Sequence, residues 1–455
     1  LWSHHEITMG QTIQVFNEKA HRLLVLVILL VGLFEAAWGL LQLFGIVSSG
    51  HFRYAFSGSF YNPGPYACFL AIVMPLALNV SIHAGNKLQK TLGMSMVAAC
   101  AILIPASLSR TALIAGAIGG VCATWDNISA IYHRTPKRLV IILVIITMIA
   151  AGAICVKKDS AKGRFLMWKI AMTAVADVPV NGVGWEHVAG CYGNAQEQYF
   201  ASGEGTDDER LVADAPMFVF NEYLQIAIAF GPIAAFCVVG VMLGGINVAL
   251  NNKSRGIAGC AISAAVVMFA SYPFQFAIFV ITITMIMLGA WWSSAYPIVR
   301  ICGSIVTLSL CALFLTYNST VDVGSRFAEG LLLHRSYNYK ESNECLLELV
   351  GYSGDPMILN VIGKNYCSLG MPDSAEHYFT RSTHRCPNRI YPHYLLMQLY
   401  NDSAYHNHDA LMRELSIVIE TKEKIPSPAI DEMRTEARNI LESLYGNRPH
   451  SVLNE

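Results

Sequence analysis

Hydrophobic residues fill the first two thirds of the chain, and a polar pattern replaces them after about residue 317. The first part contains nine apolar segments, most of them long enough to cross a bilayer as a helix. Ser109 and Arg110 separate the third segment from the fourth, so these are either two spans joined by a tight turn or one broken span. The segments are residues 22–46, 65–83, 91–108, 111–125, 138–156, 218–248, 256–272, 274–292 and 300–317.

Basic residues predict the orientation of these spans. Lysines and arginines precede the first segment and follow the second, fourth and sixth, and all these positions fall on one side of a nine-span arrangement. We assign that side to the cytoplasm. Residues 47–64, Arg110, the large loop 157–217 and everything after residue 317 then lie on the opposite, extracytoplasmic side of the membrane.

The polar part of the chain, residues 335–445, has the periodicity of amphipathic helices. Its small and large residues follow the spacing of a tetratricopeptide-type hairpin, at Gly363, Tyr366, Gly370, Ala375, Phe379 and Pro387. Such hairpins stack into a concave surface that binds a protein partner, while a small helical cap that packs only on itself or on the membrane domain explains the pattern equally well.

The predicted fold class is therefore all-α, a polytopic helical membrane protein with a C-terminal soluble helical-repeat domain. We place the membrane domain at residues 1–317, including the large loop 157–217, and the periplasmic helical domain at residues 318–455. Because the sequence starts at Leu1 with no signal-peptide pattern, we expect earlier spans to precede it.

Composition agrees with this assignment and excludes several functions. Hydrophobic residues make up 54% of the chain and charged residues only 14%, against about 25% charged in soluble proteins. A net charge of −1 argues against a nucleic-acid partner. The twelve cysteines have no metal-binding spacing, so we expect no metal and no cofactor. If the polar tail is periplasmic, Cys367 and Cys386 could form a disulfide there.

Two arginines on the predicted outer side are the first candidates for chemistry. Arg110 is the only charged residue between Thr91 and Trp125, and Arg164 lies in the large loop. Arginine near a bilayer is costly, and guanidinium groups bind phosphate oxygens in a bidentate way. Two arginines that converge on one membrane face would suit a lipid diphosphate. A snorkelling side chain at the end of a span is the alternative for Arg110.

Polar residues near the span ends are further candidates. Asn221 and Glu222 lie in the first turn of the sixth segment, where Glu222 would act as a general base or orient one, or merely favour the start of a helix. Asn62 would line a polar pocket or cap the second segment. Trp168, one helical turn after Arg164, would brace the guanidinium or sit at the membrane interface.

Three other features of the first part carry weaker signals. Glu35 is a carboxylate within the first segment and should face the interior of the bundle. The two glycines of Asn181-Gly182-Val183-Gly184 would let a ligand approach the backbone closely. The acidic residues 202–214 are expected to form a solvated, flexible loop.

Taken in order, these motifs resemble the O-antigen ligase and O-antigen polymerase superfamily and the related protein O-oligosaccharyltransferases, over about residues 22–317. The resemblance implies an inverting, metal-independent glycosyltransferase with an undecaprenyl diphosphate-linked glycan as donor and a glycan, lipid or protein acceptor. It also implies that Arg110 and Arg164 hold the diphosphate. The residues that carry it are Gly58-Ser59-Phe60-Tyr61-Asn62-Pro63, Ser109-Arg110, Arg164-Phe165-Leu166-Met167-Trp168, Pro179-Val180-Asn181-Gly182-Val183-Gly184 and Asn221-Glu222-Tyr223-Leu224-Gln225.

The chain departs from the family at the general base. The family usually has a histidine just before the Asn-Glu-Tyr-Leu run, and this chain has Phe220 there. Glu222 takes over this role, or a loop residue such as His187 or Asp214 does. A polysaccharide or anion transporter and a non-catalytic platform for envelope assembly are the competing interpretations, and loss of function on substituting either arginine would exclude the platform.

Overall fold

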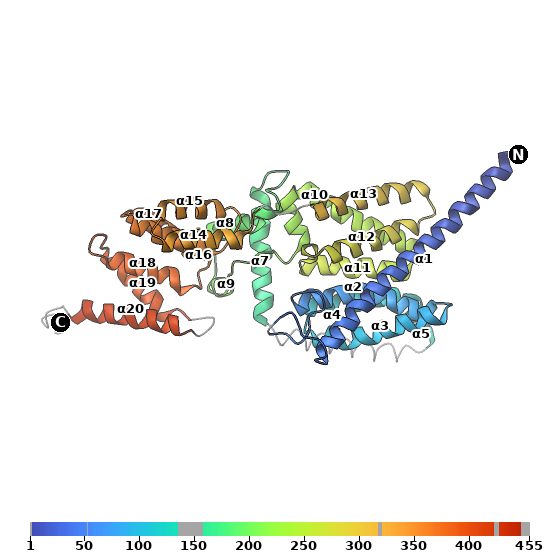
Figure 1. Ribbon diagram of the computed structural model, residues 1–455, viewed down its shortest axis with the longest axis horizontal. Coiled ribbons are helices and arrows are strands. Elements are labelled where there is room, and N and C mark those ends of the chain that lie inside the picture. The colour runs from blue at the N-terminus through green and yellow to red at the C-terminus, as the bar shows by residue number, and fades with distance from the viewer. Residues whose placement is uncertain (1, 52, 135–157, 317–320, 423–426, 447–455) are drawn as a thin grey trace. The chain divides into compact units, whose positions relative to one another are not determined.

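The computed structural model describes residues 2–51, 53–134, 158–316, 321–422 and 427–446, and these residues form helices and no strand (Figure 1). Eight of the nine predicted spans coincide with helices, and the remaining one, residues 138–156, lies outside the described residues. The eight are α1 (Trp2–Leu43), α2 (Pro63–His83), α3 (Lys87–Ala106), α4 (Arg110–Ala123), α10 (Glu222–Asn251), α11 (Arg255–Ala270), α12 (Ala277–Trp292) and α13 (Pro297–Thr316).

Five of these helices are long and apolar enough to cross a membrane: α1 from Lys19 to Leu43, α2, α3, α10 and α13. The apolar helices α4, α11 and α12 are shorter. The prediction of an all-α, polytopic membrane protein is confirmed. At Ser109, α3 ends at Ala106 and α4 begins at Arg110, so the two segments are separate helices.

The chain divides into two compact units. We call the first the bundle unit, which comprises Leu1–Lys158, Phe220–Tyr223 and Ala234–Asn318. We call the second the loop–tail unit, which comprises Asp159–Val219, Leu224–Ile233 and Ser319–Glu455. The large loop therefore packs in one unit with the C-terminal helices.

Small residues set the packing of the bundle unit around α2, α4 and α11. Gly119 of α4 and Gly259 of α11 lie against each other's backbone and against Pro75 of α2, where a Cβ atom would not fit. Between the same two helices, the buried Ser263 hydroxyl donates a hydrogen bond of 2.8 Å to the carbonyl of Ala115. Close backbone approach and interhelical hydrogen bonds are the usual means by which membrane helices associate, because lipid supplies no hydrophobic driving force between them.

In the loop–tail unit, the large loop is mostly helical. It forms α7 (Lys158–Asp177), η1 (Trp185–His187), α8 (Val188–Ala201) and α9 (Asp207–Val212). Apolar residues of α7, α8 and the first part of α10 share one buried core, which includes Ile170, Tyr192 and Ile228. The expectation that residues 202–214 form a solvated loop holds only in part: most of these residues are exposed, but Thr206 and Glu209 form a capping box that starts the short helix α9.

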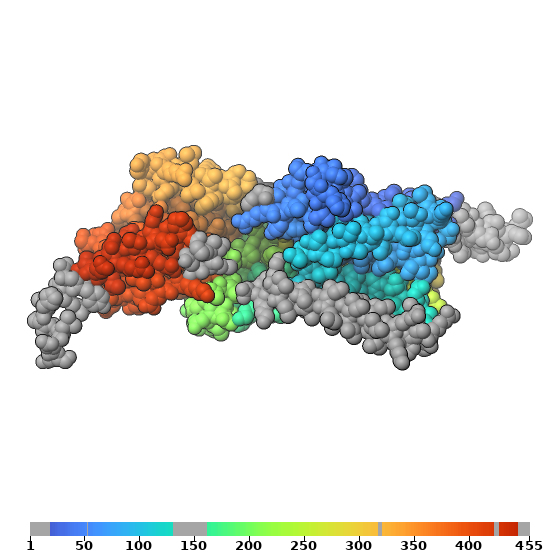
Figure 2. All heavy atoms as spheres, turned by 90° about the horizontal axis from the view of Figure 1, so that it is seen from below, coloured from blue at the N-terminus to red at the C-terminus, as the bar shows by residue number. Residues whose placement is uncertain are grey.

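The described residues of the tail form seven helices, and the first six pair as hairpins. They are α14 (Val323–Arg335), α15 (Tyr339–Leu349), α16 (Pro356–Ser368), α17 (Pro372–Arg385), α18 (Ile390–Asn401), α19 (His408–Glu420) and α20 (Pro428–Gly446). The hairpins start at Val323, Pro356 and Ile390, so the intervals are 33 and 34 residues. The atoms of the last hairpin and of α20, in red tones, pack into one continuous body (Figure 2).

A small residue faces a large one at the same place in the first two hairpins. Gly330 packs against Leu346, and Gly363 packs against the ring of Phe379. Each large residue follows its glycine by 16 positions, and the second pair follows the first by 33. The two cysteines for which a disulfide was considered, Cys367 and Cys386, are both free thiols, because Cys386 is buried while Cys367 lies on the exposed face of α16.

Candidate functional site

Several of the predicted motifs meet at one end of the bundle unit, which we call the site end. The sulfur of Cys68 in α2 lies 4.0 Å from the hydroxyl of Ser109, which precedes α4. Thr111 donates from Oγ1 to the carbonyl of Ala270 at the end of α11, at 3.3 Å. The ring of Phe60, which precedes α2, packs edge-on against Phe276, at 5.2 Å between centroids. The starts of α2 and α4 are thus joined to the turn that follows α11.

The helices α2 and α4 direct their N-termini to this site end. Asn62 caps α2 by accepting a hydrogen bond from the amide of Gly64 at 2.8 Å, and Ser109 caps α4 through the amide of Ala112 at 3.4 Å. Asn62 was expected to line a polar pocket or to cap this helix, and the structure shows it as the cap. Helix N-termini carry partial positive charge and unpaired amides, so two of them at one place favour an anion.

Arg110 is the first residue of α4 and adds a full positive charge there. It is half-buried, and among the described residues no carboxylate forms an ion pair with it. Leu108, two residues earlier, has a φ of 53°, a left-handed conformation that lets the chain reverse between α3 and α4. A guanidinium held at a helix start without a protein counter-ion is suited to binding an anionic ligand.

Glu222 starts α10 and has no exposed surface. Its Oε1 accepts a hydrogen bond of 2.7 Å from the amide of Phe274, in the turn after α11, and its Oε2 has no partner among the described residues. Asn221 beside it is 5% exposed. Glu222 is therefore tied to the site end by one oxygen and leaves the other free to accept.

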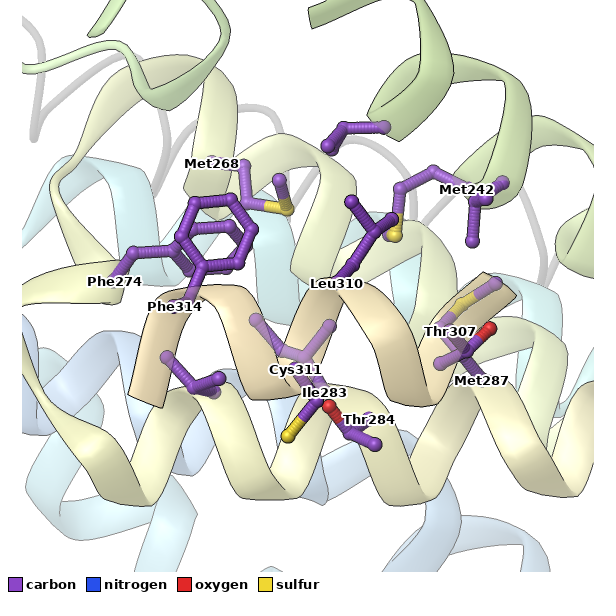
Figure 3. A pocket seen from close by; sticks show the side chains of 13 residues that line it. Met242, Met268, Phe274, Ile283, Thr284, Met287, Thr307, Leu310, Cys311 and Phe314 are labelled. Atoms are coloured by element: carbon purple, nitrogen blue, oxygen red, sulfur yellow. The ribbon is translucent and has the colours of Figure 1, made fainter. Parts of the chain in front are cut away.

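Phe220 stands where the family usually has a histidine, and it serves packing here. Its φ is 55°, and its ring meets that of Tyr272 edge-on at 4.8 Å. Phe274, whose amide binds Glu222, directs its own ring into an apolar cavity beside Phe314 and Met268 (Figure 3). The cavity measures about 40 Å³, room for a few water-sized groups at most, so it is no site for a sugar.

Arg164 and Trp168 belong to the loop–tail unit. Both lie on α7, four residues apart, so they share a helix face as predicted. Arg164 is half-buried, and Trp168 packs against the core of the unit. The ring of Trp168 also meets that of Phe165 edge-on at 5.7 Å.

The Asn181–Gly184 turn packs against a kink in α10. Pro232 lacks the amide that would bond the carbonyl of Ile228, and that carbonyl accepts instead from the amide of Val183 at 3.0 Å. The carbonyl of Ala229 likewise accepts from Gly184 at 2.9 Å. Gly182 lies directly against Ala229, where a Cβ would not fit. The glycines of this motif therefore allow close approach of the protein's own backbone.

His187 and Asp214 bind the tail. His187 lies 3.0 Å through Nδ1 from the carbonyl of Gly351, between α15 and α16, and its ring packs on Tyr352 at 4.2 Å. Because a carbonyl only accepts, Nδ1 carries a proton in this hydrogen bond. Asp214 is exposed and pairs with Arg389 at 3.3 Å.

One cluster in the loop–tail unit was missed by sequence reasoning. Glu197 of α8 binds Arg381 at 2.6 Å and Arg385 at 3.0 Å, both from α17. The residues lie 184 and 188 positions apart in the chain, so no local pattern signals the pairing. Of the predicted site residues, Asn62, Arg110, Asn221 and Glu222 belong to the bundle unit, while Arg164, Trp168, His187 and Asp214 belong to the loop–tail unit.

These features define a multi-pass helical membrane protein with a cationic, carboxylate-bearing site at one end of its bundle. Residues 95–239 match the family model described as O-antigen ligase, which supports the predicted O-antigen ligase and polymerase superfamily. The match includes Arg110, Arg164 and Glu222. It indicates a membrane glycosyltransferase of the O-antigen ligase type and lipid-linked glycan substrates in general. No curated protein and no solved structure matches the chain.

Proposed function

We propose that this protein transfers a glycan from an undecaprenyl diphosphate-linked donor to an acceptor hydroxyl at the periplasmic face of the bacterial inner membrane. The observation that carries the proposal is Arg110, a half-buried guanidinium with no ion-pair partner among the described residues, placed where α2 and α4 begin. A diphosphate is both the anion that such a place binds and the leaving group of the donor.

In this mechanism the acceptor oxygen attacks the anomeric carbon of the donor sugar. The bond from that carbon to the phosphate oxygen breaks, its electron pair stays on the diphosphate, and Arg110 stabilises the charge that develops. Arg164 is the second arginine proposed for the donor, and we propose that Trp168, four residues on and on the same helix face, braces its guanidinium. A single displacement inverts the anomeric centre, and we propose that it needs no metal.

Glu222 is the first candidate for the group that takes the acceptor proton. It belongs to the same site end as Arg110, and its Oε2 is buried without a partner among the described residues. Buried polar atoms are almost always satisfied, so a ligand hydroxyl at this oxygen would complete its hydrogen bonding. His187 and Asp214 remain the alternatives in the loop–tail unit.

The tail supports a role in selecting an acceptor or a protein partner. Three hairpins at intervals of 33 and 34 residues, with a repeated glycine and large apolar residue, match the period of tetratricopeptide repeats. We propose that residues 318–455 form such a domain on the periplasmic side. A protein acceptor, as in the protein O-oligosaccharyltransferases, is therefore the second candidate function.

The test is turnover of a labelled undecaprenyl diphosphate-linked oligosaccharide by the purified protein, with envelope extract as acceptor. We expect release of undecaprenyl diphosphate, a loss of about 100-fold or more in Arg110→Ala, and a smaller loss in Arg110→Lys, which keeps the charge without the bidentate geometry. Arg255→Ala is the matched control, because Arg255 begins α11 at the end opposite Ala270 and pairs there with Asp126 at 3.3 Å.

Two substitutions of Glu222 separate a base from a positioning group. Glu222→Gln keeps an oxygen that accepts from the amide of Phe274 but cannot take a proton, while Glu222→Ala removes both functions. If Glu222 is the general base, both variants should be inactive. If Glu222→Gln is active and Glu222→Ala is not, Glu222 has a positioning role. No release from several donors by the wild-type protein would overturn the proposed function in favour of a transporter or an assembly platform.

A further inference from the structure

Two polar side chains of α1 are buried two helical turns apart. Glu35 is 1% exposed and Gln42 is 4% exposed, and a spacing of seven residues puts them on one face of the helix. Polar groups within a span are costly unless they have partners. Both bind one short segment, residues 57–59, which leads to the N-terminus of α2, and Gln42 also donates to the carbonyl of Ser48 at 3.5 Å.

Gln42 binds this segment from both sides of its amide. Its Oε1 accepts hydrogen bonds from the amides of Ser57 at 2.9 Å and Gly58 at 2.8 Å. Its Nε2 donates to the carbonyl of Gly58 at 3.3 Å. One buried side chain thus satisfies both the donor and the acceptor of Gly58, as an added strand would.

Glu35 binds the next residue. Its Oε1 accepts from the hydroxyl of Ser59 at 2.6 Å, and its Oε2 accepts from the amide of Ser59 at 3.1 Å. The hydroxyl of Tyr66 in α2 donates to the backbone carbonyl of Glu35 at 2.9 Å. Gly58 has a φ of 58° and packs against the Tyr66 ring, where a Cβ would not fit. The segment is therefore held in one conformation.

We propose that Glu35 and Gln42 are positioning residues for the donor site, an inference that rests on the proposed function. By fixing residues 57–59 they set the place of Phe60, whose ring packs on Phe276, and of Asn62, which caps α2 at the site end. Loss of either side chain frees the segment and displaces the start of α2 from Arg110. The donor is then bound less tightly, while the chemical step of bound donor is little changed.

Conservative and non-conservative variants test the two residues against a purely structural role. Glu35→Gln retains the pattern, because its oxygen accepts from the Ser59 amide and its amide donates to the Ser59 hydroxyl. Glu35→Leu loses both bonds, and Gln42→Glu sets a carboxylate oxygen against the Gly58 carbonyl. For Glu35→Leu and Gln42→Glu we expect the donor KM to rise about 10-fold or more at similar kcat. Each tenfold rise corresponds to a loss of about 1.4 kcal/mol of binding free energy. Glu35→Gln should have a donor KM near that of the wild type.

Ser263→Ala is the matched control. It removes a buried interhelical hydrogen bond of the same unit, from Ser263 to Ala115, and leaves residues 57–59 untouched. We expect it to lower the melting temperature in detergent without a change in donor KM. An equal rise of KM in Ser263→Ala would overturn the proposal, since any loss of bundle stability would then give the same result.

A second readout does not depend on turnover. Ser57 has no exposed surface and its hydroxyl has no partner among the described residues, so Ser57→Cys is a nearly isosteric reporter. Peptide mapping by mass spectrometry would follow its labelling by a hydrophilic maleimide in purified protein. We expect labelling at least about tenfold faster when Glu35→Leu or Gln42→Glu is added, and no change when Ser263→Ala is added.

The two readouts distinguish failure of this inference from failure of the proposed function. Faster labelling with higher donor KM supports the inference. Unchanged labelling overturns it, as does faster labelling with unchanged donor KM, because the segment would then have no part in donor binding. If the variants are labelled faster but the wild type turns over no donor, Glu35 and Gln42 do hold residues 57–59 in place, and the proposed function is overturned.

Discussion

The guanidinium of Arg385 donates from Nε to Oε2 of Glu197 at 3.0 Å, and the Arg385 side chain has no exposed surface. Arg385 also donates to the carbonyl of Ser353 at 3.2 Å and to the side-chain oxygen of Asn194. Arg381 binds the other oxygen of the same carboxylate at 2.6 Å. The cluster therefore fastens α8 of the large loop to α17 of the tail.

Breaking this cluster from one side should destabilise the loop–tail unit. Glu197→Gln leaves the buried Arg385 charge without compensation, at a cost of about 3 kcal/mol. Arg385→Met should cost less, because Glu197 keeps its ion pair with Arg381. The double variant should lose less than the sum of the single losses, because it leaves no unpaired buried charge of the pair. These free energies of unfolding can be measured by titrating the purified protein with denaturant and using the susceptibility of the tail to a protease as the readout of unfolding.

Glu348→Gln is the control for this cycle. Glu348 pairs with Arg326 at 3.6 Å, but the two side chains are 54% and 47% exposed, and such surface pairs contribute about 0–1 kcal/mol. Strict additivity of Arg385→Met and Glu197→Gln would show that the two side chains contribute independently, against the geometry described here.

The kink in α10 should be intolerant of any side chain at Gly231. This residue has a φ of 85° and lies against the carbonyl of Val180, where a Cβ would not fit. We expect Gly231→Ala to cost about 1–3 kcal/mol from backbone strain alone, with a further loss from separating the Asn181–Gly184 turn. Melting temperatures in detergent provide the measurement.

Gly240→Ala supplies the comparison within the same helix. Nothing lies within 4 Å of a Cβ at Gly240, which has no positive φ, so alanine there is neutral or stabilising by up to about 1 kcal/mol. Equal melting temperatures of the two variants would contradict the assignment of Gly231 as a packed kink.

These contacts show where sequence reasoning succeeds and where it ends. The spans were predictable because each depends on a local apolar run, and the break at Ser109 depends on a local cap. The partner of the Asn181–Gly184 turn lies more than 40 residues away, and Glu197 finds Arg385 at 188 residues. Single-sequence patterns contain no signal for such pairings. The α9 helix was predictable from its Thr206 and Glu209 capping box, but its acidic composition suggested a loop.

Glu209 should make the stability of the loop–tail unit fall in acid. Burial opposes its ionisation, but hydrogen bonds from the Thr206 amide, Lys169 and Tyr199 outweigh that effect and lower the pKa of Glu209 to about 2. The unfolded group has a pKa of about 4.5. Its contribution is therefore full above pH 4.5 and is lost as the pH falls towards 2.

The Glu209→Gln variant isolates this contribution. We expect its melting temperature to lie below that of the wild type at pH 6 and the gap to shrink at pH 3, because the unfolded wild-type chain then takes up a proton at Glu209 that the folded protein largely does not bind. Glu204→Gln changes an exposed carboxylate of the same segment and should show no such gap. A gap for Glu209→Gln that stays constant between pH 6 and pH 3 would exclude the carboxylate as its cause.

Cys367 and Cys386 should differ sharply in reactivity. Cys386 has no exposed surface, and burial raises its pKa to about 12, so it is neither accessible nor ionised at pH 7. Cys367 is exposed, and desolvation raises its pKa as well, so the contrast depends mainly on access. A maleimide at pH 7 should label Cys367 in the native protein and Cys386 only in denaturant, as peptide mapping would show.

The same labelling links the thiol to the ionic cluster beside it. Cys386 follows Arg385 directly at the end of α17, so opening the Glu197 cluster should expose both. We expect Arg385→Met to speed the labelling of Cys386 and to leave that of Cys367 unchanged. Rapid labelling of Cys386 in the native wild type would mean that the end of α17 is open to solvent, and the predicted cost of Arg385→Met would then fall to that of a surface pair.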